Sequence, residues 1–346
     1  MATTYLESDF TGTGASGPAI ATYSMWVKLE LSDTRATLVS GKDNGSYLKV
    51  RFADDGSGHY LGMYGSSMDM KSTRLFRDPA AWYHVVMAFD TGQAAADDRI
   101  KVWINNEQIT DWPTNTRLAQ NDPLYLTKAD NVQIGAYNNT EHFDGVMAHV
   151  HCCDGTAYTP ADFGETDSTS GIWIAKTSPS VTYGSKGYFL KFASGAHGTD
   201  SSGNGNDFTV NGTMTNTKDT PDNNFCTMNP LDNYLQSMTF SNGNNTIVTD
   251  YASPATATIG VTTGKWYWEC KAVASSGTQF LTGIRSTQVT DLNAENGYRA
   301  NDWSYYGTTG DYRNNDSGTS YGNTYTVGDI IGVALDITNS KLYFSK

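Results

Sequence analysis

The sequence predicts an all-β protein in which two antiparallel β-sandwiches are joined by an extended connector. Three observations support this fold class. The chain has almost no helical periodicity, short runs of alternating or of β-branched and aromatic residues recur along it, and clusters of Gly, Asn and Asp separate these runs. Such a pattern is typical of the strands and turns of sandwiches. At 346 residues, the chain has room for two domains and a connector.

The first predicted domain covers residues 1–165. Pro160 suits the first turn of a helix, so a brief helical turn is expected at Thr159–Phe163. In the run Trp82–Phe89, every second side chain, starting with Trp82 and His84, lies on one face. The predicted strands are Tyr23–Leu29, Thr37–Ser40, Tyr47–Phe52, Tyr60–Tyr64, Trp82–Phe89, Ile100–Ile104, Val132–Ala136 and Gly145–His151.

Several weak motifs of this domain occur in a characteristic order. They are Ser24–Lys28, Trp82–Val86, Val102–Glu107, and Ile134-Gly135 followed by Phe143–Gly145. Together they resemble the landmarks of a laminin-G or concanavalin-A-like domain. The resemblance implies a jelly-roll sandwich for most of residues 1–165.

Residues 166–234 form the predicted extended connector. This segment is rich in Gly, Ser, Asn and Pro and has few apolar runs. Gly187–Phe192 can add an edge strand, and Asp200–Asp207 is predicted to be a tight polar loop. Thr220–Leu231 is expected to pack on the domains, because it carries Phe225, Met228 and Leu231.

Residues 235–346 form the second predicted sandwich. Gly264–Cys270 predicts one strand, and Gly328–Lys346 predicts two strands around a turn. These segments resemble the SPRY domain, a β-sandwich that binds partners and carries no catalytic residues of its own. Relatives run on into an Asn-Gly turn and further strands. We therefore expect that the native protein continues past Lys346, or that a neighbouring chain covers the exposed edge.

The whole layout resembles a type of protein found in tailed phages of marine bacteria. There a laminin-G-like domain is followed by segments like Gly187–Phe192, Asp200–Asn206 and Asp222–Leu231, and then by a SPRY-like domain. The resemblance implies a non-catalytic virion structural protein, either a capsid-surface decoration or a fibre or tail component. It would be made in the bacterial cytoplasm and act at the virion surface in assembly, host adhesion or both. Its partners would be other virion proteins and further copies of itself.

Two alternatives remain open beside this interpretation. One is a receptor-binding adhesin of a tail fibre, whose ligand is a host cell-surface glycan. The other is a polysaccharide depolymerase. Glucanases of the jelly-roll fold carry Glu-x-Asp-x-x-Glu on one strand, so that their carboxylates share a face. The nearest match begins at Glu165 and Asp167 but ends in Ser170 and falls after the jelly roll, so no enzymatic activity is expected.

Charge and hydropathy exclude other classes of function. The formal net charge of −13 disfavours nucleic acid and anionic membrane surfaces as partners. The sequence contains no run of about 18 apolar residues, and its start lacks the features of a signal peptide.

The four cysteines form no Cys-x-x-Cys pair, which favours free thiols over a zinc site or disulfides. His149 and His151 can share a strand face as a metal pair, but hydrogen-bonded strand histidines are favoured.

One loop is a candidate calcium site, and no other cofactor is predicted. Asp200, Ser202 and Asn204 carry oxygen at alternate positions ahead of Gly205, as in the first half of an EF-hand loop. The twelfth position is Asn211, where the EF-hand needs a bidentate Glu. The alternative is a polar turn in which the Asp side chain bonds its own backbone.

Two groups of polar and aromatic residues are candidate ligand-binding surfaces. Tyr and Trp combine a flat apolar face with a polar tip, which suits stacking on sugars or anchoring a protein. The alternative is that such aromatic residues fill the core, which is the favoured interpretation for Trp266 and Trp268. The candidates are Trp303, Tyr305, Tyr306, Tyr312 and Tyr321 in the second sandwich, and Tyr137, Asn138 and Glu141 in the first.

Overall fold

The computed structural model describes residues 3–10, 19–31, 34–128, 131–233, 238–249, 253–274, 280–286 and 294–346. Within these ranges nearly all regular structure is β, as predicted; the exceptions are α1 (Tyr125–Lys128), η1 (Ala96–Asp98) and η2 (Pro160–Asp162). The turn η2 confirms the expected helical turn. None of the helices in the described ranges is long and apolar enough to cross a membrane. The chain forms two compact units, residues 1–230 with 240–247 and residues 231–239 with 248–346.

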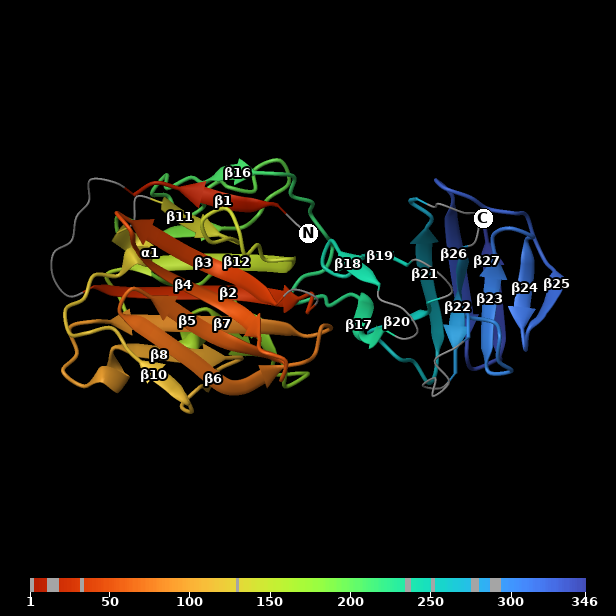
Figure 1. Cartoon of the computed structure of the whole chain (residues 1–346), viewed down its shortest axis with the longest axis horizontal. Helices are drawn as coiled ribbons and strands as arrows, with labels where there is room; N and C mark the ends of the chain where they lie inside the picture. The colour runs from red at the N-terminus through yellow and green to blue at the C-terminus, as the bar shows by residue number, and fades with distance from the viewer. Residues whose placement is uncertain are drawn as a thin grey trace. The chain divides into compact units, whose positions relative to one another are not determined.

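The first unit contains two antiparallel sheets (Figure 1). The order of the eight-stranded sheet is β10 (Thr114–Thr116), β6 (Met68–Phe76), β5 (His59–Gly65), β4 (Ser46–Asp54), β3 (Arg35–Asp43), β11 (Asn131–Ile134), β1 (Tyr5–Ser8) and β16 (Thr209–Asn211). The order of the six-stranded sheet is β15 (Tyr188–Leu190), β12 (Gly145–Asp154), β2 (Ile20–Leu29), β7 (Trp82–Asp90), β8 (Ile100–Ile104) and β9 (Glu107–Gln108).

Both sheets contribute to one large hydrophobic core. In β4, the alternate residues Leu48, Val50 and Phe52 are fully buried in this core. Because successive side chains of a strand point to opposite faces, Lys49 and Arg51 lie on the other face of the sheet. This alternation gives the eight-stranded sheet one apolar and one polar face.

The first unit extends well beyond residue 165, because the following segment completes both of its sheets. β15 pairs with β12 at the edge of one sheet, and β16 pairs with β1 at the edge of the other. The edge strand expected within Gly187–Phe192 is therefore confirmed. A separate hairpin joins β13 (Gly164–Thr166) to β14 (Trp173–Ala175).

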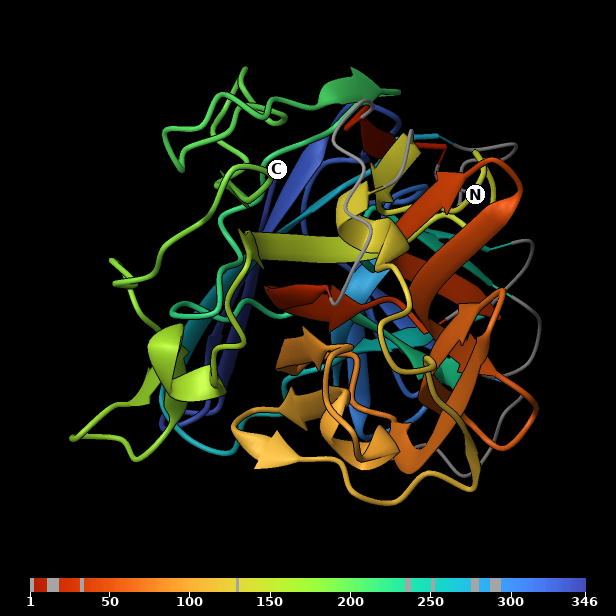
Figure 2. The ribbon, with the colours of Figure 1, turned by 90° about the vertical axis from the view of Figure 1, so that its left-hand side faces the viewer.

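The same segment supplies side chains that cover the outer face of the six-stranded sheet. Trp26 and Trp82 form a second apolar cluster with residues of the β13–β14 hairpin. His84 stacks on Trp26 with 4.6 Å between ring centroids and accepts a 2.9 Å hydrogen bond from Trp173 Nε1. In Figure 2 the segment, drawn in yellow-green and green, lies on the side of the first unit away from the orange strands β4–β6.

A buried ion pair anchors the end of this segment. Lys28 Nζ lies 2.7 Å from Asp219 Oδ2, and both side chains are only 2% exposed. Trp82 Nε1 donates to the other carboxylate oxygen at 2.8 Å.

The segment Thr220–Leu231 packs on the first unit as expected, since Lys28 bonds Asn224 and the Phe225 carbonyl. Met228 is half-buried, but the Phe225 and Leu231 side chains are 42% and 57% exposed and contribute little to this packing. Polar contacts hold the segment instead.

The second unit contains a three-stranded and a four-stranded antiparallel sheet. The first has the order β21 (Lys265–Lys271), β26 (Ile330–Asp336) and β27 (Lys341–Ser345), and the second β22 (Leu281–Arg285), β23 (Asp302–Tyr306), β24 (Asp311–Asn314) and β25 (Ser317–Ser320). These bounds confirm the strands predicted in Gly264–Cys270 and Gly328–Lys346. Two further pairs lie near the division between the units. One joins β17 (Met228–Asn233) to β20 (Ala255–Ala257), and the other joins β18 (Thr239–Ser241) to β19 (Thr246–Val248), most of whose residues belong to the first unit.

Candidate functional site

The outer face of the eight-stranded sheet carries continuous rows of polar side chains. The strand register aligns Ser40, Lys49, Tyr64 and Asp69 across four neighbouring strands. The next row contains Thr37, Arg51, Gly62 and Lys71. We call this surface the polar sheet face. It comprises Tyr47, Lys49, Arg51, Tyr60, Tyr64 and Lys71 of the sheet, together with Tyr137, Asn138 and Glu141 of the loop after β11.

Glu141 is the electrostatic centre of the polar sheet face. Its Oε2 accepts hydrogen bonds from Lys49 Nζ at 2.8 Å and from Arg51 at 2.7 Å, while Arg35 lies 3.5 Å from Oε1. Burial alone would raise the pKa of Glu141, but the bonds from Lys49 and Arg51 outweigh it and hold the pKa below its usual value. The ionised carboxylate is thus shared by three cations, which leaves a local excess of positive charge.

Tyrosine rings pack against these cations. Lys49 Nζ lies 4.1 Å from the ring centroid of Tyr137, a cation–π distance. Tyr137 in turn contacts Tyr47, with 5.2 Å between the centroids. Asn138 accepts a 2.9 Å hydrogen bond from Lys42. The structure therefore brings the predicted residues Tyr137, Asn138 and Glu141 to the edge of one surface.

A second pair of tyrosines, Tyr60 and Tyr64, lies beside these cations. A Cβ atom on Gly62 would come within 2.5 Å of the Tyr64 ring, so that ring occupies the space above the glycine. The Arg51 guanidinium lies 4.5 Å from the centroid of the same ring. The hydroxyls of Tyr60 and Tyr64 are 3.1 Å apart, and burial raises the pKa of Tyr64 to about 12. Lys71 lies 4.3 Å from the Tyr60 ring.

The strand residues of this site were missing from the sequence-based candidates. Tyr47, Lys49 and Arg51 alternate with buried residues within one predicted strand. A strand in which cationic residues or Tyr alternate with core residues presents a polar and aromatic outward face. The sequence alone could therefore have indicated Tyr47, Lys49 and Arg51 as site residues. The contact with Glu141, about 90 residues further along the chain, could not be inferred in this way.

In the second unit the structure brings Tyr305, Tyr312 and Tyr321 into ring contact, but part of the candidate group is buried. Tyr305 and Tyr306 are 2% and 7% exposed, and Tyr305 belongs to the core of this unit. Burial of their rings corrects the prediction that these two residues contact a ligand, and the alternative that Tyr305 fills the core holds. Trp268 packs against the same core, whereas Trp266 is 46% exposed.

The remaining candidates of the second unit are more accessible. Trp303 and Tyr312 are half-buried, and Tyr321 is 42% exposed. The Tyr321 hydroxyl donates to the Phe344 carbonyl at 3.1 Å and accepts from the Phe344 N–H at 2.9 Å. Tyr321 thus ties its loop to β27, and a ligand role for these three residues stays a prediction.

The candidate calcium loop is closed by its own hydrogen bonds. Asp200 Oδ1 accepts from the N–H groups of Phe189 and Ser202, and Oδ2 accepts from Ser202 Oγ and the N–H of Asn206. Burial raises the pKa of Asp200, but these bonds outweigh burial and lower it. Asn204 donates to two backbone carbonyls. This is the geometry of the alternative, a polar turn. Across the described ranges, no group of three or more His, Cys, Asp or Glu side chains is placed to hold a metal ion.

The histidine pair on β12 is part of the covered face. His151 stacks on Phe189 with 3.9 Å between centroids, and its Nδ1 lies 2.9 Å from the Tyr183 hydroxyl. Burial lowers the pKa of His151 well below its usual value and also lowers that of His149. His151 is therefore a hydrogen-bonded, neutral strand histidine, as favoured from the sequence.

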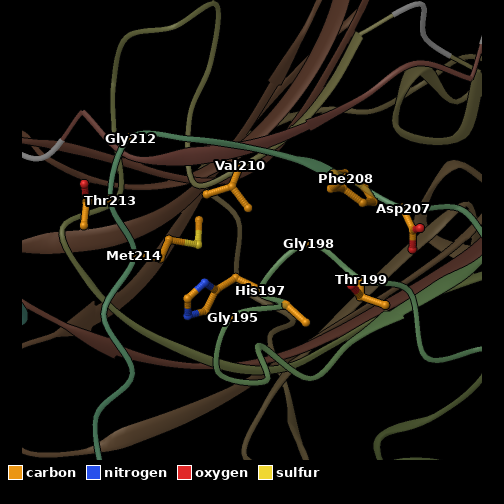
Figure 3. A pocket seen from close by; sticks show the side chains of 11 residues that line it. Gly195, His197, Gly198, Thr199, Asp207, Phe208, Val210, Gly212, Thr213 and Met214 are labelled. Carbon is orange, nitrogen blue, oxygen red and sulfur yellow. The ribbon is translucent and has the colours of Figure 1, made fainter.

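A shallow hollow of about 500 Å³ lies between residues 195–199 and 207–214 (Figure 3). Val210, Met214 and His197 lie around it. Its polar groups are already engaged, because His197 Nε2 lies 2.9 Å from Asn216 Oδ1 and the Asp207 carboxylate accepts from the Asp200 N–H. The hollow therefore offers a ligand little beyond apolar contact.

Comparison with known proteins assigns a family to each sandwich. Residues 4–162 match the concanavalin A-like lectin/glucanases superfamily, and residues 265–346 match the SPRY domain. The chain therefore carries a concanavalin A-like domain followed by a SPRY domain. No curated protein matches the chain.

Two solved structures are similar to parts of the chain. One is a putative carbohydrate binding protein from Bacteroides ovatus, with 20% identity and a TM-score of 0.41 over 64% of this chain. The other is domain 4 of AbnA, a GH43 extracellular arabinanase from Geobacillus stearothermophilus, in complex with arabinotriose, with 21% identity and a TM-score of 0.31 over 42% of this chain. The chain spans 59% and 65% of the lengths of these two structures.

Proposed function

We propose that the protein is a non-catalytic glycan-binding protein and that its ligand lies on the polar sheet face. One observation carries the proposal: the partly exposed Tyr64 ring lies over Gly62, beside the linked charges of Arg51, Glu141 and Lys49, whose side chains are 9–14% exposed. A sugar ring has one face of C–H groups and a rim of hydroxyls. A flat aromatic ring next to fixed hydrogen-bonding groups complements both.

The side chains of this surface are held in place before any ligand arrives. Glu141 fixes the positions of Lys49 and Arg51, and the Arg51 guanidinium packs on the Tyr64 ring. Ordering long side chains on binding costs about 0.5–1.5 kcal/mol each. A surface that is already ordered avoids much of this cost. The match of residues 4–162 to a superfamily of lectins and glucanases supports the same function.

The carboxylates of the chain favour binding over hydrolysis. A glycosidase needs a pair of carboxyl groups, one of them protonated to act as an acid. Lys49 and Arg51 keep Glu141 ionised. Asp167, from the nearest sequence match to a catalytic motif, accepts hydrogen bonds from the N–H groups of Thr169 and Ser170 within a hairpin turn. We therefore include the absence of catalysis in the proposal.

The setting we propose is the surface of a phage particle. The order of the two domains, and the resemblance of the segments between them to virion proteins of tailed phages, support this setting. The protein would be present in several copies, contact other virion proteins and bind a glycan of the host surface. Electron microscopy of labelled particles tests this part: a regular position on the capsid favours a decoration protein, a fibre tip favours a receptor-binding adhesin, and absence from particles overturns it.

Binding measurements on the full chain test the glycan site. Tyr64→Ala removes the ring and Gly62→Val displaces it, so each change should weaken glycan binding by about tenfold or more. A glycan array identifies a ligand, and isothermal titration calorimetry measures its affinity.

The matched control is Tyr158→Ala, because Tyr158 is a half-buried tyrosine whose contacts, with the Phe163 ring and with Thr22 of the six-stranded sheet, lie outside the polar sheet face. It should leave the affinity unchanged. Equal affinity of the wild type and the Tyr64 and Gly62 variants would show that the ligand binds elsewhere.

A further inference from the structure

The outward face of the three-stranded sheet in the second unit carries two prominent tyrosines. Tyr267 of β21 and Tyr343 of β27 are 62% and 55% exposed. The register aligns both with Ala334 of β26, so the three residues form one row across the sheet. On the opposite face, Val333 and Phe344 are buried in the core. We call the row of Tyr267, Ala334 and Tyr343 the tyrosine platform.

The floor beside this platform is flat because β26 contributes only small residues there. A Cβ atom on Gly332 would lie 2.7 Å from the Tyr267 hydroxyl and 2.8 Å from Ser345 Oγ. The Tyr267 side chain therefore leans across Gly332. Its hydroxyl donates a 2.9 Å hydrogen bond to Glu269, which fixes the direction of the ring.

The spacing of the two rings suits an extended glycan. Neighbouring strands lie 4.7–4.9 Å apart, so β21 and β27, on either side of β26, are separated by about 9.5 Å. In an extended β-linked glycan, the same ring face recurs at every second sugar. The Tyr267 and Tyr343 side chains therefore start two strands apart, and the Tyr267 ring leans toward β26 across Gly332. From these positions the two rings can contact alternate sugars of a chain that runs across the strands.

Charged side chains border the platform. The adjoining row contains Lys265, Asp336 and Lys341, and Lys265 Nζ lies 3.4 Å from Asp336 Oδ2. Glu269 and Lys271 lie on the other side of Tyr267 along β21. These groups supply the donors and acceptors that sugar hydroxyls need.

The composition of this face favours a glycan over a protein. The centre of a protein–protein interface is a well-packed cluster of large side chains. Here the centre consists of Ala334 and Gly332, and the only large aliphatic side chain of β26 on this face is Ile330 at its end. We infer that the tyrosine platform is a second glycan-binding site, built to stack on the alternate sugars of an extended β-linked chain.

Calorimetry on the full chain tests this site in isolation from the first. The probes are the β-1,4-linked oligosaccharides xylohexaose, cellohexaose and chitohexaose, and the starting protein carries Tyr64→Ala to disable the polar sheet face. This protein should still bind at least one probe. Adding Tyr267→Ala and Tyr343→Ala should weaken that binding by at least about tenfold. Adding Gly332→Val instead should also weaken it, because the valine displaces the Tyr267 ring.

The control is Tyr298→Ala, since Tyr298 is 44% exposed in the same unit but its ring lies beside Arg299. It should not change the affinity, and circular dichroism should show that all variants are folded. The inference is overturned if the Tyr64→Ala protein binds none of the probes, or if the platform substitutions leave binding intact. It is also overturned if the platform substitutions abolish self-association in ultracentrifugation while no probe binds, since the face would then join two copies.

The outcomes separate the two sites. If Tyr64→Ala alone removes all glycan binding, the proposed function stands and the platform fails. If Tyr64→Ala has no effect in the wild type while the platform substitutions remove binding, the platform stands and the polar sheet face fails.

Discussion

At the scale of single residues, buried polar side chains hold segments of this protein in place. Asp219 is the clearest case, because its two carboxylate oxygens contact Lys28 and Trp82 in a buried environment. Lys28 Nζ is further bonded to Asn224 and to the Phe225 carbonyl. A charge of this kind is tolerated only while its partners are present. The segment around residue 219 is therefore fixed by specific geometry and not by apolar burial.

Asp219→Ala should lower the free energy of unfolding by about 3–5 kcal/mol, because it leaves the Lys28 charge buried and uncompensated. Urea denaturation followed by tryptophan fluorescence at pH 7 measures the loss. Asp222→Ala, at an exposed position three residues away, is the control and should have little effect. Replacing both partners with apolar residues, as in Lys28→Met with Asp219→Leu, should cost less than Asp219→Ala alone. A loss below 1 kcal/mol for Asp219→Ala would contradict this account.

His84 should make stability depend on pH. Burial lowers its pKa from the ordinary 6.5 to about 3. Below pH 6.5 the unfolded chain binds a proton at this residue while the folded protein does not, so falling pH favours unfolding. The contribution of neutral His84 to the free energy of unfolding is complete above about pH 7 and is lost as the pH falls from 6.5 toward 3. Between pH 6.5 and 5 the free energy of unfolding should drop by about 2 kcal/mol from His84 alone.

Urea denaturation across this pH range tests the histidine effect. His149 and His151, whose pKa values are also lowered by burial, should add to it in the same direction. His84→Gln should reduce the pH dependence between pH 6.5 and 5. If the free energy of unfolding of the His84 variant changed with pH as steeply as that of the wild type, His84 would not be the source of the pH dependence.

At the scale of elements, the sequence predicted most of the long strands of the first unit, but it missed the nine-residue strand β6 and most of the short strands. Strands such as Trp82–Asp90 carry enough alternation to be recognised locally. β16 has only three residues and pairs with β1 about 200 residues earlier, so no local pattern could place it. The segment after residue 165 was therefore assigned to a connector, although it supplies edge strands to both sheets.

The dependence on contacts between distant residues also explains which site residues were predicted from the sequence. Tyr137, Asn138 and Glu141 stood out because a polar-aromatic loop is visible in one stretch of sequence. Lys49 acquires its role only from Glu141, and a single sequence does not reveal that pairing. Alternation also cannot tell an inner from an outer face until the partner strands are known. For this reason Tyr305 was placed on a surface although it lies in the core.

At the scale of the whole molecule, the chain divides into two units with separate hydrophobic cores. The core of the first unit contains Leu38 and the core of the second contains Ile331, both almost fully buried. Units with their own cores generally fold and unfold as separate cooperative bodies. The first unit has by far the larger core, so the two units should differ in stability.

Calorimetric unfolding of the full chain should therefore show two transitions. Leu38→Ala and Ile331→Ala each create a cavity, with an expected cost of about 2–5 kcal/mol. Leu38→Ala should lower the midpoint of one transition by several degrees and leave the other in place, while Ile331→Ala should do the reverse. If either substitution shifted both transitions together, or if the chain unfolded in one step, the two units would form a single cooperative body. The glycan-binding variants of each unit would then have to be judged against the stability of the whole chain.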